Sequence, residues 1–112
     1  MYGDFWTPEQ AIARVRSNGG FDVFKYVRVG DEFRFTFIGG PHADCLKSPE
    51  ERSNAVSAGT VNVRIAGCLP PLGVLVTDYS MRLQLMPAEG DAEKIAALFG
   101  TVVRDWNDPL PY

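Results

Sequence analysis

The chain has few of the residue types on which enzymes most often depend, because its 112 residues include one histidine and two cysteines. A closed zinc site needs four ligands, drawn mainly from these residue types. His42, Asp44 and Cys45 are too few for such a site, and no second cysteine or histidine pair supplies the rest. We therefore expect neither a metal nor a cofactor.

Positive charge is also sparse. The chain has 11 Lys and Arg against 14 Asp and Glu, which gives a net charge of −3. No basic run of the kind that grips a phosphate backbone is present. The acidic excess lies in residues 48–112, which hold eight acidic and five basic residues. This distribution argues against a nucleic-acid-binding protein.

Long apolar segments are missing as well. The longest uncharged run, residues 65–77, is too short to span a bilayer and contains two prolines. The N-terminal residues lack both the basic region and the apolar region of a secretory signal. We therefore expect a cytoplasmic protein with no membrane partner. In that reducing compartment Cys45 and Cys68 are expected to be free thiols.

What the chain does contain is an aromatic β-hairpin. Residues 21–29 and 33–38 are rich in β-branched and aromatic side chains, with phenylalanines at period two in the second stretch. Only Gly30, Asp31 and Glu32 separate the two stretches, so they are typical of adjacent antiparallel strands. Other parts of the chain must cover the aromatic face of this hairpin.

The length of the loop decides the register. A two-residue Gly30-Asp31 loop suits a type II′ turn. It gathers one set of aromatic residues on one face: Phe24, Tyr26, Phe33, Phe35 and Phe37. The opposite face then carries Val23, Lys25, Val27, Val29, Arg34 and Thr36. A three-residue loop shifts the register by one residue. Val27 and Val29 then lie on the face of the phenylalanines of the second strand, and the other face carries Phe24, Tyr26 and Arg28 together with Arg34.

Local signals predict two helices in the first half of the chain. Thr7-Pro8-Glu9-Gln10 has the pattern of a capping box with proline at the first helical position, and Asn18-Gly19-Gly20 ends that helix. Ser48-Pro49-Glu50-Glu51 repeats the start signal. It predicts a short surface helix that ends near Gly59.

Alternating or continuous apolar residues predict strands at 60–65, 74–76 and 81–86. A final helix is expected to begin at the cap residue Asp91, because apolar residues follow at helical spacing: Ile95, Leu98, Phe99, Val102, Val103 and Trp106. The order α-β-β-α-β-β-β-α with short connections favours antiparallel neighbours. We therefore expect one α+β domain over residues 1–112. It should contain a single antiparallel sheet of about five strands, helices packed mainly on one face, and an extended tail at 107–112.

One short segment resembles a catalytic site. In the loop after the hairpin, a histidine could lower the pKa of a thiol or act as a base, and a carboxylate could orient the imidazole ring. The candidate catalytic residues are His42, Asp44 and Cys45. However, adjacent residues rarely point toward one another, and catalytic triads are usually assembled from distant segments. We therefore favour a polar loop with an unreactive cysteine.

The second face of the hairpin carries the clearest indication of function. In either register it is neither polar nor fully apolar, and mixed aliphatic, aromatic and arginine surfaces are typical of protein interfaces. The candidate binding residues are Lys25, Val27, Arg28, Arg34 and Thr36. The competing interpretation is that the second helix, or the proline-containing loop at 67–73, covers this face.

These observations predict a small, non-enzymatic protein that binds another protein or associates with itself as a homodimer. A stoichiometric inhibitor or immunity-type protein fits this class, and the acidic C-terminal half would suit a basic partner surface. The alternative is a small enzyme or ligand-binding protein that uses His42, Asp44 and Cys45. That alternative requires a concave pocket beside the loop.

Overall fold

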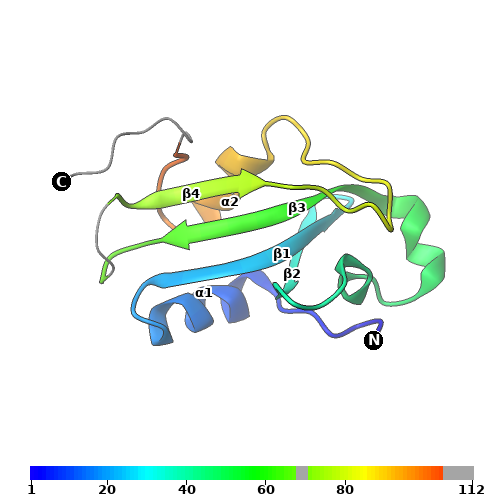
Figure 1. Ribbon diagram of the computed structural model, residues 1–112, viewed down its shortest axis with the longest axis horizontal. Helices are drawn as coiled ribbons and strands as arrows, with labels where there is room; N and C mark the ends of the chain where they lie inside the picture. Colours follow the sequence, from blue (N-terminus) through cyan, green and yellow to red (C-terminus); the bar gives the residue numbers. More distant parts are fainter. Residues whose placement is uncertain (68–70, 105–112) are drawn as a thin grey trace.

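In the computed structural model, four antiparallel strands form one sheet in the order β2-β1-β3-β4 (Figure 1). The structure describes residues 1–67 and 71–104. Its elements, with η for a 3₁₀ helix, are α1 (Pro8–Ser17), β1 (Phe21–Val29), β2 (Glu32–Phe37), η1 (His42–Cys45), η2 (Pro49–Asn54), β3 (Ala55–Arg64), β4 (Gly73–Thr77) and α2 (Asp91–Leu98). The α+β class with a single antiparallel sheet is confirmed, with four named strands in the described residues instead of about five. Cys68, Trp106 and the expected tail at 107–112 lie outside the described residues.

The hairpin of β1 and β2 has the two-residue loop. Tyr26 pairs with Phe35, and Val29 pairs with Glu32 across the turn. Gly30 has φ 59°, which supplies the positive φ that the first position of a type II′ turn requires, whereas Asp31 has no positive φ. Of the two registers that the sequence leaves open, the structure has the one that gathers the aromatic residues on one face.

The aromatic side of the sheet, called the first face below, carries the larger apolar core. Phe24 and Phe35 pack edge to face with ring centroids 5.2 Å apart, and Phe99, just after α2, lies 5.9 Å from each of them. Helix α1 contributes Ala11 and Val15 to the same core. Figure 1 shows α2 behind β3 and β4, so both α-helices serve this one face.

Helix α1 forms as its start signal predicts. The side chain of Thr7 accepts from the backbone amide of Gln10, the side chain of Gln10 accepts from the amide of Thr7, and Pro8 is the first helical residue. The helix ends at the cap Asn18, and Gly19 and Gly20 follow with φ of 76° and 89°. Local chemistry therefore determines both ends of this helix.

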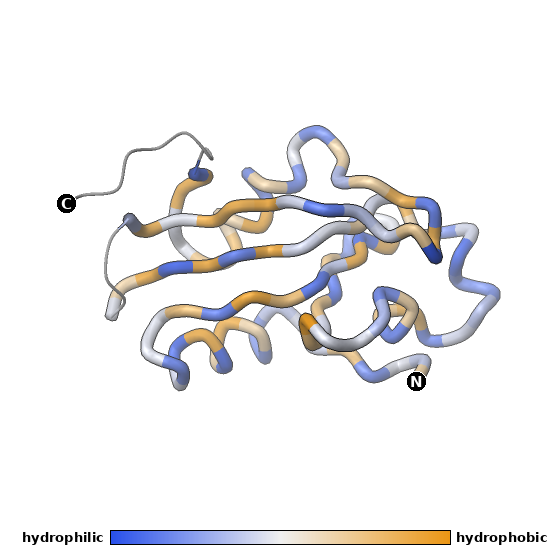
Figure 2. The backbone as a smooth tube through the Cα atoms, in the orientation of Figure 1, coloured by the Kyte–Doolittle hydropathy of each residue, from blue (hydrophilic) through white to orange (hydrophobic). Residues whose placement is uncertain are grey.

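The opposite side of the sheet, called the second face, alternates with the first. Figure 2 shows hydrophobic and hydrophilic residues alternating along β1 and β3. Over the hairpin end of this face, Val27 and Val29 pack beneath Cys45 and Leu46 in a second apolar cluster, to which Leu83 also belongs. The segment that includes η1 thus covers part of the second face, while α1 and α2 leave it free.

A buried ion pair holds this covering segment in place. The guanidinium of Arg34, whose side chain is 3% exposed, donates to both carboxylate oxygens of Glu51, over 2.7 and 3.0 Å. It also donates to the carbonyl of Cys45 over 3.0 Å and to Glu32 over 3.3 Å. These bonds tie η1 and η2 to β2. They also hold the pKa of the Glu51 carboxyl below its ordinary value.

The short surface helix predicted after Ser48 is present only in part, because it is a 3₁₀ helix that ends at Asn54 instead of near Gly59. Residues 49–54 form the 3₁₀ helix η2, in which Ser48 makes no side-chain cap. Strand β3 begins at Ala55, where the chain pairs with β1, and Ala58 lies opposite Val27. The start signal is local and weak, and pairing with a neighbouring strand outweighs it, because the small side chains of Ala55 and Ala58 fit into the second apolar cluster with Cys45 and Leu46.

The expected strand at 81–86 is wrong. The chain turns there, with Gln84 at φ 55°, and only an isolated bridge joins Ser80 to Leu85. The segment leaves the sheet after β4, so its apolar side chains do not share one buried face. Leu83 is buried in the second cluster, while Met81 and Met86 are exposed.

The last helix is shorter than its apolar spacing predicts. Helix α2 ends at Leu98, and Gly100 follows with φ 67°. Residues 102–104 instead pair in parallel with β4, because the amide of Val74 donates to Val102 and the amide of Arg104 donates to Val74. An unpaired strand edge is costly to leave open, and this pairing satisfies part of the edge of β4.

Asp91 is not the cap that the sequence predicts. Gly90 occupies the cap position, and Asp91 is a fully buried first residue of α2. One of its carboxylate oxygens accepts from the hydroxyl of Tyr26 over 2.8 Å and from the amide of Ala88 over 2.9 Å. Its other oxygen lies 3.4 Å from Arg28. The residue thus joins the start of α2 to β1.

Two phenylalanines on the same strand and face should differ in their contribution to stability. Phe35 is fully buried and Phe37 is 57% exposed. We expect Phe35→Ala to lower the free energy of unfolding by about 3–5 kcal/mol, and Phe37→Ala by about 1 kcal/mol. Denaturant unfolding of the two variants measures the difference, and equal losses would contradict the assignment of the core.

The Arg34 ion pair should be essential to folding. Arg34→Glu places a carboxylate in a buried site beside Glu51 and Glu32, so we expect a loss of about 3–5 kcal/mol in the free energy of unfolding. Arg52→Glu, which makes the same charge change on η2, should cost about 0.5 kcal/mol. Unfolding monitored by circular dichroism tests this, and an Arg34→Glu variant as stable as Arg52→Glu would refute it.

Candidate binding cleft on the second sheet face

Part of the second face remains open. Beyond the residues that η1 covers, cross-strand pairs lie in the rows Lys25–Thr60, Val23–Asn62 and Phe21–Arg64. Their side chains are half-buried, apart from the buried Thr60, whereas Val27 and Ala58 in the covered part are fully buried. We call these three rows, together with Leu75 and Thr77 on β4, the open half of the second face.

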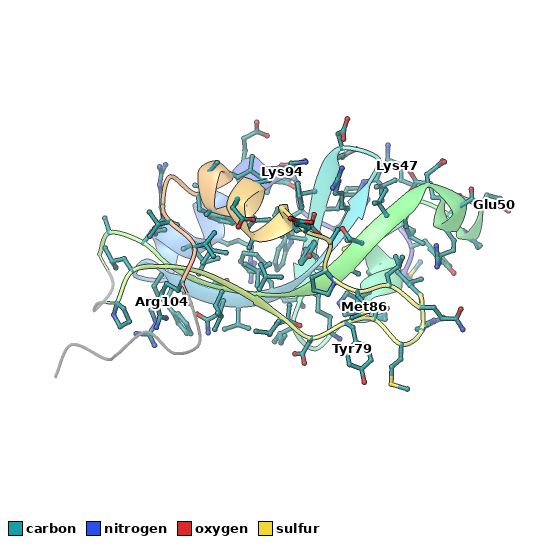
Figure 3. The ribbon with its side chains drawn as sticks, turned by 90° about the horizontal axis from the view of Figure 1, so that it is seen from above. Lys47, Glu50, Tyr79, Met86, Lys94 and Arg104 are labelled. Atoms are coloured by element: carbon teal, nitrogen blue, oxygen red, sulfur yellow. The ribbon has the colours of Figure 1, made fainter. Side chains whose placement is uncertain are left out.

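A cleft of about 350 Å³ lies where the open half meets the covering segment. Lys25, His42 and Thr60 line it from the sheet and η1, and exposed apolar side chains form much of its rim: Ile38, Tyr79 and Met81. Asp78 and Arg82, from the loop after β4, add charges to the lining. Figure 3 shows Tyr79 and Met86 on the side of the sheet opposite Lys94 of α2.

Lys25 is the charged residue that the sheet itself supplies to the cleft. Its Nζ donates to the carbonyl of Gly40 over 2.6 Å. An ammonium group has three N–H donors, so this bond uses one of them. Within residues 1–67 and 71–104, no carboxylate lies within ion-pair distance of this ammonium group.

His42 presents a defined tautomer. Its Nε2 lies 3.0 Å from the carbonyl oxygen of Gly59. A carbonyl can only accept, so Nε2 must carry the proton of this bond. Burial lowers the pKa of the ring below its ordinary value, which keeps it neutral at neutral pH. Nδ1 is therefore an acceptor, and no hydrogen-bond partner for it is found in the described part of the chain.

The three candidate catalytic residues do not form a catalytic group. His42 bonds Gly59, the Asp44 carboxylate lies 2.8 Å from the amino group of Met1, and the Cys45 thiol donates to the carbonyl of Arg34 over 3.5 Å. Among the hydrogen bonds of the described residues, none joins two of the three. The segment folds as a 3₁₀ turn, which directs consecutive side chains to different surroundings.

The five candidate binding residues also separate. Val27, Arg34 and Thr36 are buried, and the hydroxyl of Thr36 donates to the carbonyl of Asp4. Arg28 is engaged with Asp91 and with the hairpin turn. Lys25 is the member of the set that lines the cleft.

Sequence reasoning missed two arginines at the far end of the open half. The guanidinium of Arg64 lies 5.4 Å from the ring centroid of Phe21, and Arg64 pairs with Gly73 on β4. A side chain at Gly73 would collide with Arg104, so the Arg104 stem packs directly over this glycine. Figure 3 shows Arg104 on the same side of the sheet as Tyr79.

A sequence signal existed for one of these arginines. Arg64 follows Asn62 on the polar side of an alternating strand, so its face could be predicted from the period of two. Arg104 had no such signal, because residues 102–104 fit the spacing of a continuing helix. Only their pairing with Val74 places Arg104 beside Arg64.

A second cleft, of about 390 Å³, lies beside the N-terminal segment. Trp6 and Phe37 line it together with the carboxylates of Asp4 and Asp44. The chain itself supplies the opposing charges there: the Arg14 guanidinium lies 4.0 Å from the Trp6 ring centroid, and the Met1 amino group contacts both carboxylates. In the parts of the chain that the structure describes, no group of three or more metal-ligating side chains occurs, and no helix is long and apolar enough to cross a membrane.

The Cys45 thiol should be inert in the folded protein. Burial raises its pKa to about 12, and the thiolate is the reactive form. We expect iodoacetamide at pH 8 to leave Cys45 unmodified in the native protein and to alkylate it fully in denaturant. Mass spectrometry of the Cys45 peptide measures both states. Rapid labelling of the native protein would show an accessible, activated thiol.

Comparison with known proteins identifies no relative of this chain. No family model matches the chain, and neither the curated proteins nor the solved structures contain a match. The functional argument therefore rests on the open half of the second face and on the cleft beside it.

Proposed function

We propose that this protein is a non-catalytic binding protein that holds an acidic segment of a protein partner on the open half of the second face. The observation that carries this proposal is the gathering of basic side chains on one side of the sheet: Lys25, Arg64, Arg82 and Arg104. Within the described ranges, none of the four has a carboxylate within ion-pair distance.

The surroundings of these cations favour binding of an anion. Lys25, Arg64 and Arg104 are half-buried, so part of their hydration has been lost, and an opposite charge there is screened less than at a fully exposed site. Exposed or half-buried apolar residues lie between and beside them, including Val23, Leu75 and Tyr79. A mixture of arginine, aromatic and aliphatic side chains is typical of protein interfaces.

The charges on the open half support an acidic partner. The acidic C-terminal half of the sequence favours a basic partner, but the side chains that gather on the open half are basic. An acidic polypeptide therefore fits this surface better. Nucleic acid fits it less well, because the chain as a whole has a net charge of −3 and would repel a long polyanion outside this small surface.

An enzymatic role has less support. His42 has its tautomer fixed by Gly59, but no serine, threonine or cysteine nucleophile donates to this ring in the described residues. Burial keeps Cys45 protonated. The cleft beside His42 does supply the concavity that a ligand-binding role requires, so binding without chemistry accounts for both the cleft and the basic face.

The proposal predicts that two arginines at the far end of the open half contribute to binding. The probe is a fluorescent synthetic peptide that alternates glutamate with leucine, titrated with the full chain at low salt. We expect Arg64→Glu with Arg104→Glu to weaken binding by about tenfold or more. The matched control, Arg16→Glu with Lys94→Glu, makes the same charge change on the helices of the first face and should bind nearly as well as the parent.

Two results would contradict the proposal. Equal weakening by the two double variants would show attraction to net charge without a surface. Tighter binding of a single-stranded oligonucleotide of the same charge than of the peptide would show that the basic face serves nucleic acid. Circular dichroism of each variant verifies that the fold is retained.

A further inference from the structure

We propose that the cleft between η1 and the loop after β4 is a carboxylate subsite, in which Lys25 holds the anion and His42 strengthens its binding as the pH falls. This inference rests on the proposed function, because it names the group of the partner that enters the cleft. It adds a ligand class and a regulation that the basic face alone does not provide.

Lys25 supplies the permanent charge of the subsite. Its bond to the carbonyl of Gly40 fixes the ammonium group at the lining of the cleft and uses one of its three donors. The remaining donors match the oxygens of a carboxylate. Charge-assisted hydrogen bonds of this kind are about twice as strong as neutral ones.

His42 supplies a charge that depends on pH. Its Nε2–H remains bound to the carbonyl of Gly59, so an added proton must go to Nδ1. In the neutral ring Nδ1 is an acceptor, and it offers no hydrogen bond to a carboxylate oxygen, which is also an acceptor. In the protonated ring Nδ1–H becomes a donor, and the ring lines the same cleft as Lys25. One proton taken up by His42 thus accompanies the bound anion.

The charges around His42 come from three parts of the chain. Lys25 on β1 opposes protonation of the ring, whereas Asp78 in the loop after β4 favours it. Arg82 of the same loop also lines the cleft, and Asp44 within η1 pairs with the amino group of Met1. Burial is the largest influence and lowers the pKa of the free protein's imidazole. A carboxylate bound between Lys25 and His42 adds a negative charge at the ring and raises that pKa.

The sign of the pH dependence follows from this difference. The complex binds a proton more readily than the free protein, so affinity rises as the pH falls through the pKa of His42 in the complex. The gain ends below the pKa of His42 in the free protein, where both states are protonated. Protonation of the ligand carboxylate, near pH 4 for ordinary carboxyl groups, sets a lower limit.

The size of the cleft favours a single side chain as occupant. Its volume of about 350 Å³ is at the small end of ligand sites, and Tyr79 and Ile38 at the rim provide apolar contacts for the stem that carries the carboxylate. A glutamate or aspartate side chain of the partner and a free carboxylic acid share this chemistry. The test below separates the two sources.

The single histidine of the chain makes a direct test available, because the titrating Hε1 and Hδ2 signals of imidazole in an NMR spectrum can come only from His42. The full-length protein is titrated with pH in sodium acetate and in sodium chloride of equal ionic strength. We expect acetate to move the midpoint of His42 to higher pH. We also expect the affinity for acetate to rise with falling pH by at most about tenfold per pH unit, the limit for uptake of one proton.

Two variants separate the roles of the two residues. Lys25→Met keeps the apolar stem and removes the charge, and it should abolish the response of the His42 midpoint to acetate. His42→Gln can still donate to Gly59 but cannot titrate, so acetate binding should lose its pH dependence. An acetate effect that persists in Lys25→Met, or no effect of acetate on the parent, would overturn the carboxylate subsite.

The source of the carboxylate is decided with the glutamate-leucine peptide and a matched glutamine-leucine peptide. If the glutamate peptide shifts the midpoint of His42 and the glutamine peptide does not, a partner side chain enters the cleft. If acetate alone shifts it, the cleft takes a free carboxylic acid, and the part of the inference that assigns a partner side chain is wrong. Failure of the subsite leaves peptide binding through Arg64 and Arg104 intact, so the two proposals fail separately.

Discussion

The buried guanidinium of Arg34 is the interaction on which the second face depends. It projects from β2 with its side chain 3% exposed, and it binds Glu51, Glu32 and the carbonyl of Cys45. An arginine in this position is costly unless its donors are satisfied. The segment from η1 to η2 supplies most of the acceptors for its two terminal nitrogens, whereas the buried Nε has no hydrogen-bond partner. The same segment therefore pairs this charge and covers Val27 and Val29.

The covering segment also determines where the second face remains open. The edge of the area that it covers lies at His42, whose ring is hydrogen-bonded to the carbonyl of Gly59 and lines the cleft. Beyond that point the sheet carries side chains that the chain's own elements leave half-buried, and the charged ones are basic. The division of this face into a covered half and an open half places the proposed binding surface at one end of the sheet and the stabilising ion pair at the other. Mutations at the two ends should therefore separate stability from binding.

Much of the hairpin and of the first helix could be predicted from the sequence, because both depend on neighbouring residues. The Gly30-Asp31 turn sets the register, and Thr7 with Gln10 caps α1. The start signal at Ser48 and the apolar spacing after Asp91 both predicted helices that are longer than the observed ones, and for the same reason. Each is a local preference of a few tenths of a kcal/mol per residue, and pairing with β1 or with the edge of β4 outweighs it. Among the candidate site residues, Lys25 and His42 line the cleft. Arg64 and Arg104 both lie beside Gly73 only because β3 and residues 102–104 pair with β4.

By itself, then, the sequence determined the α+β class, the hairpin with its row of phenylalanines on the second strand, and the mixed character of one hairpin face, because alternation and turn chemistry act over a few residues. The tertiary structure alone decided which half of that opposite face is buried. Arg28, Arg34 and Lys25 are alike in the sequence as cations on neighbouring strands. Their surroundings differ in the folded protein, because Asp91 pairs with Arg28 and Glu51 pairs with Arg34. Both carboxylates are distant in the chain, and only folding determines which cation a distant carboxylate can reach.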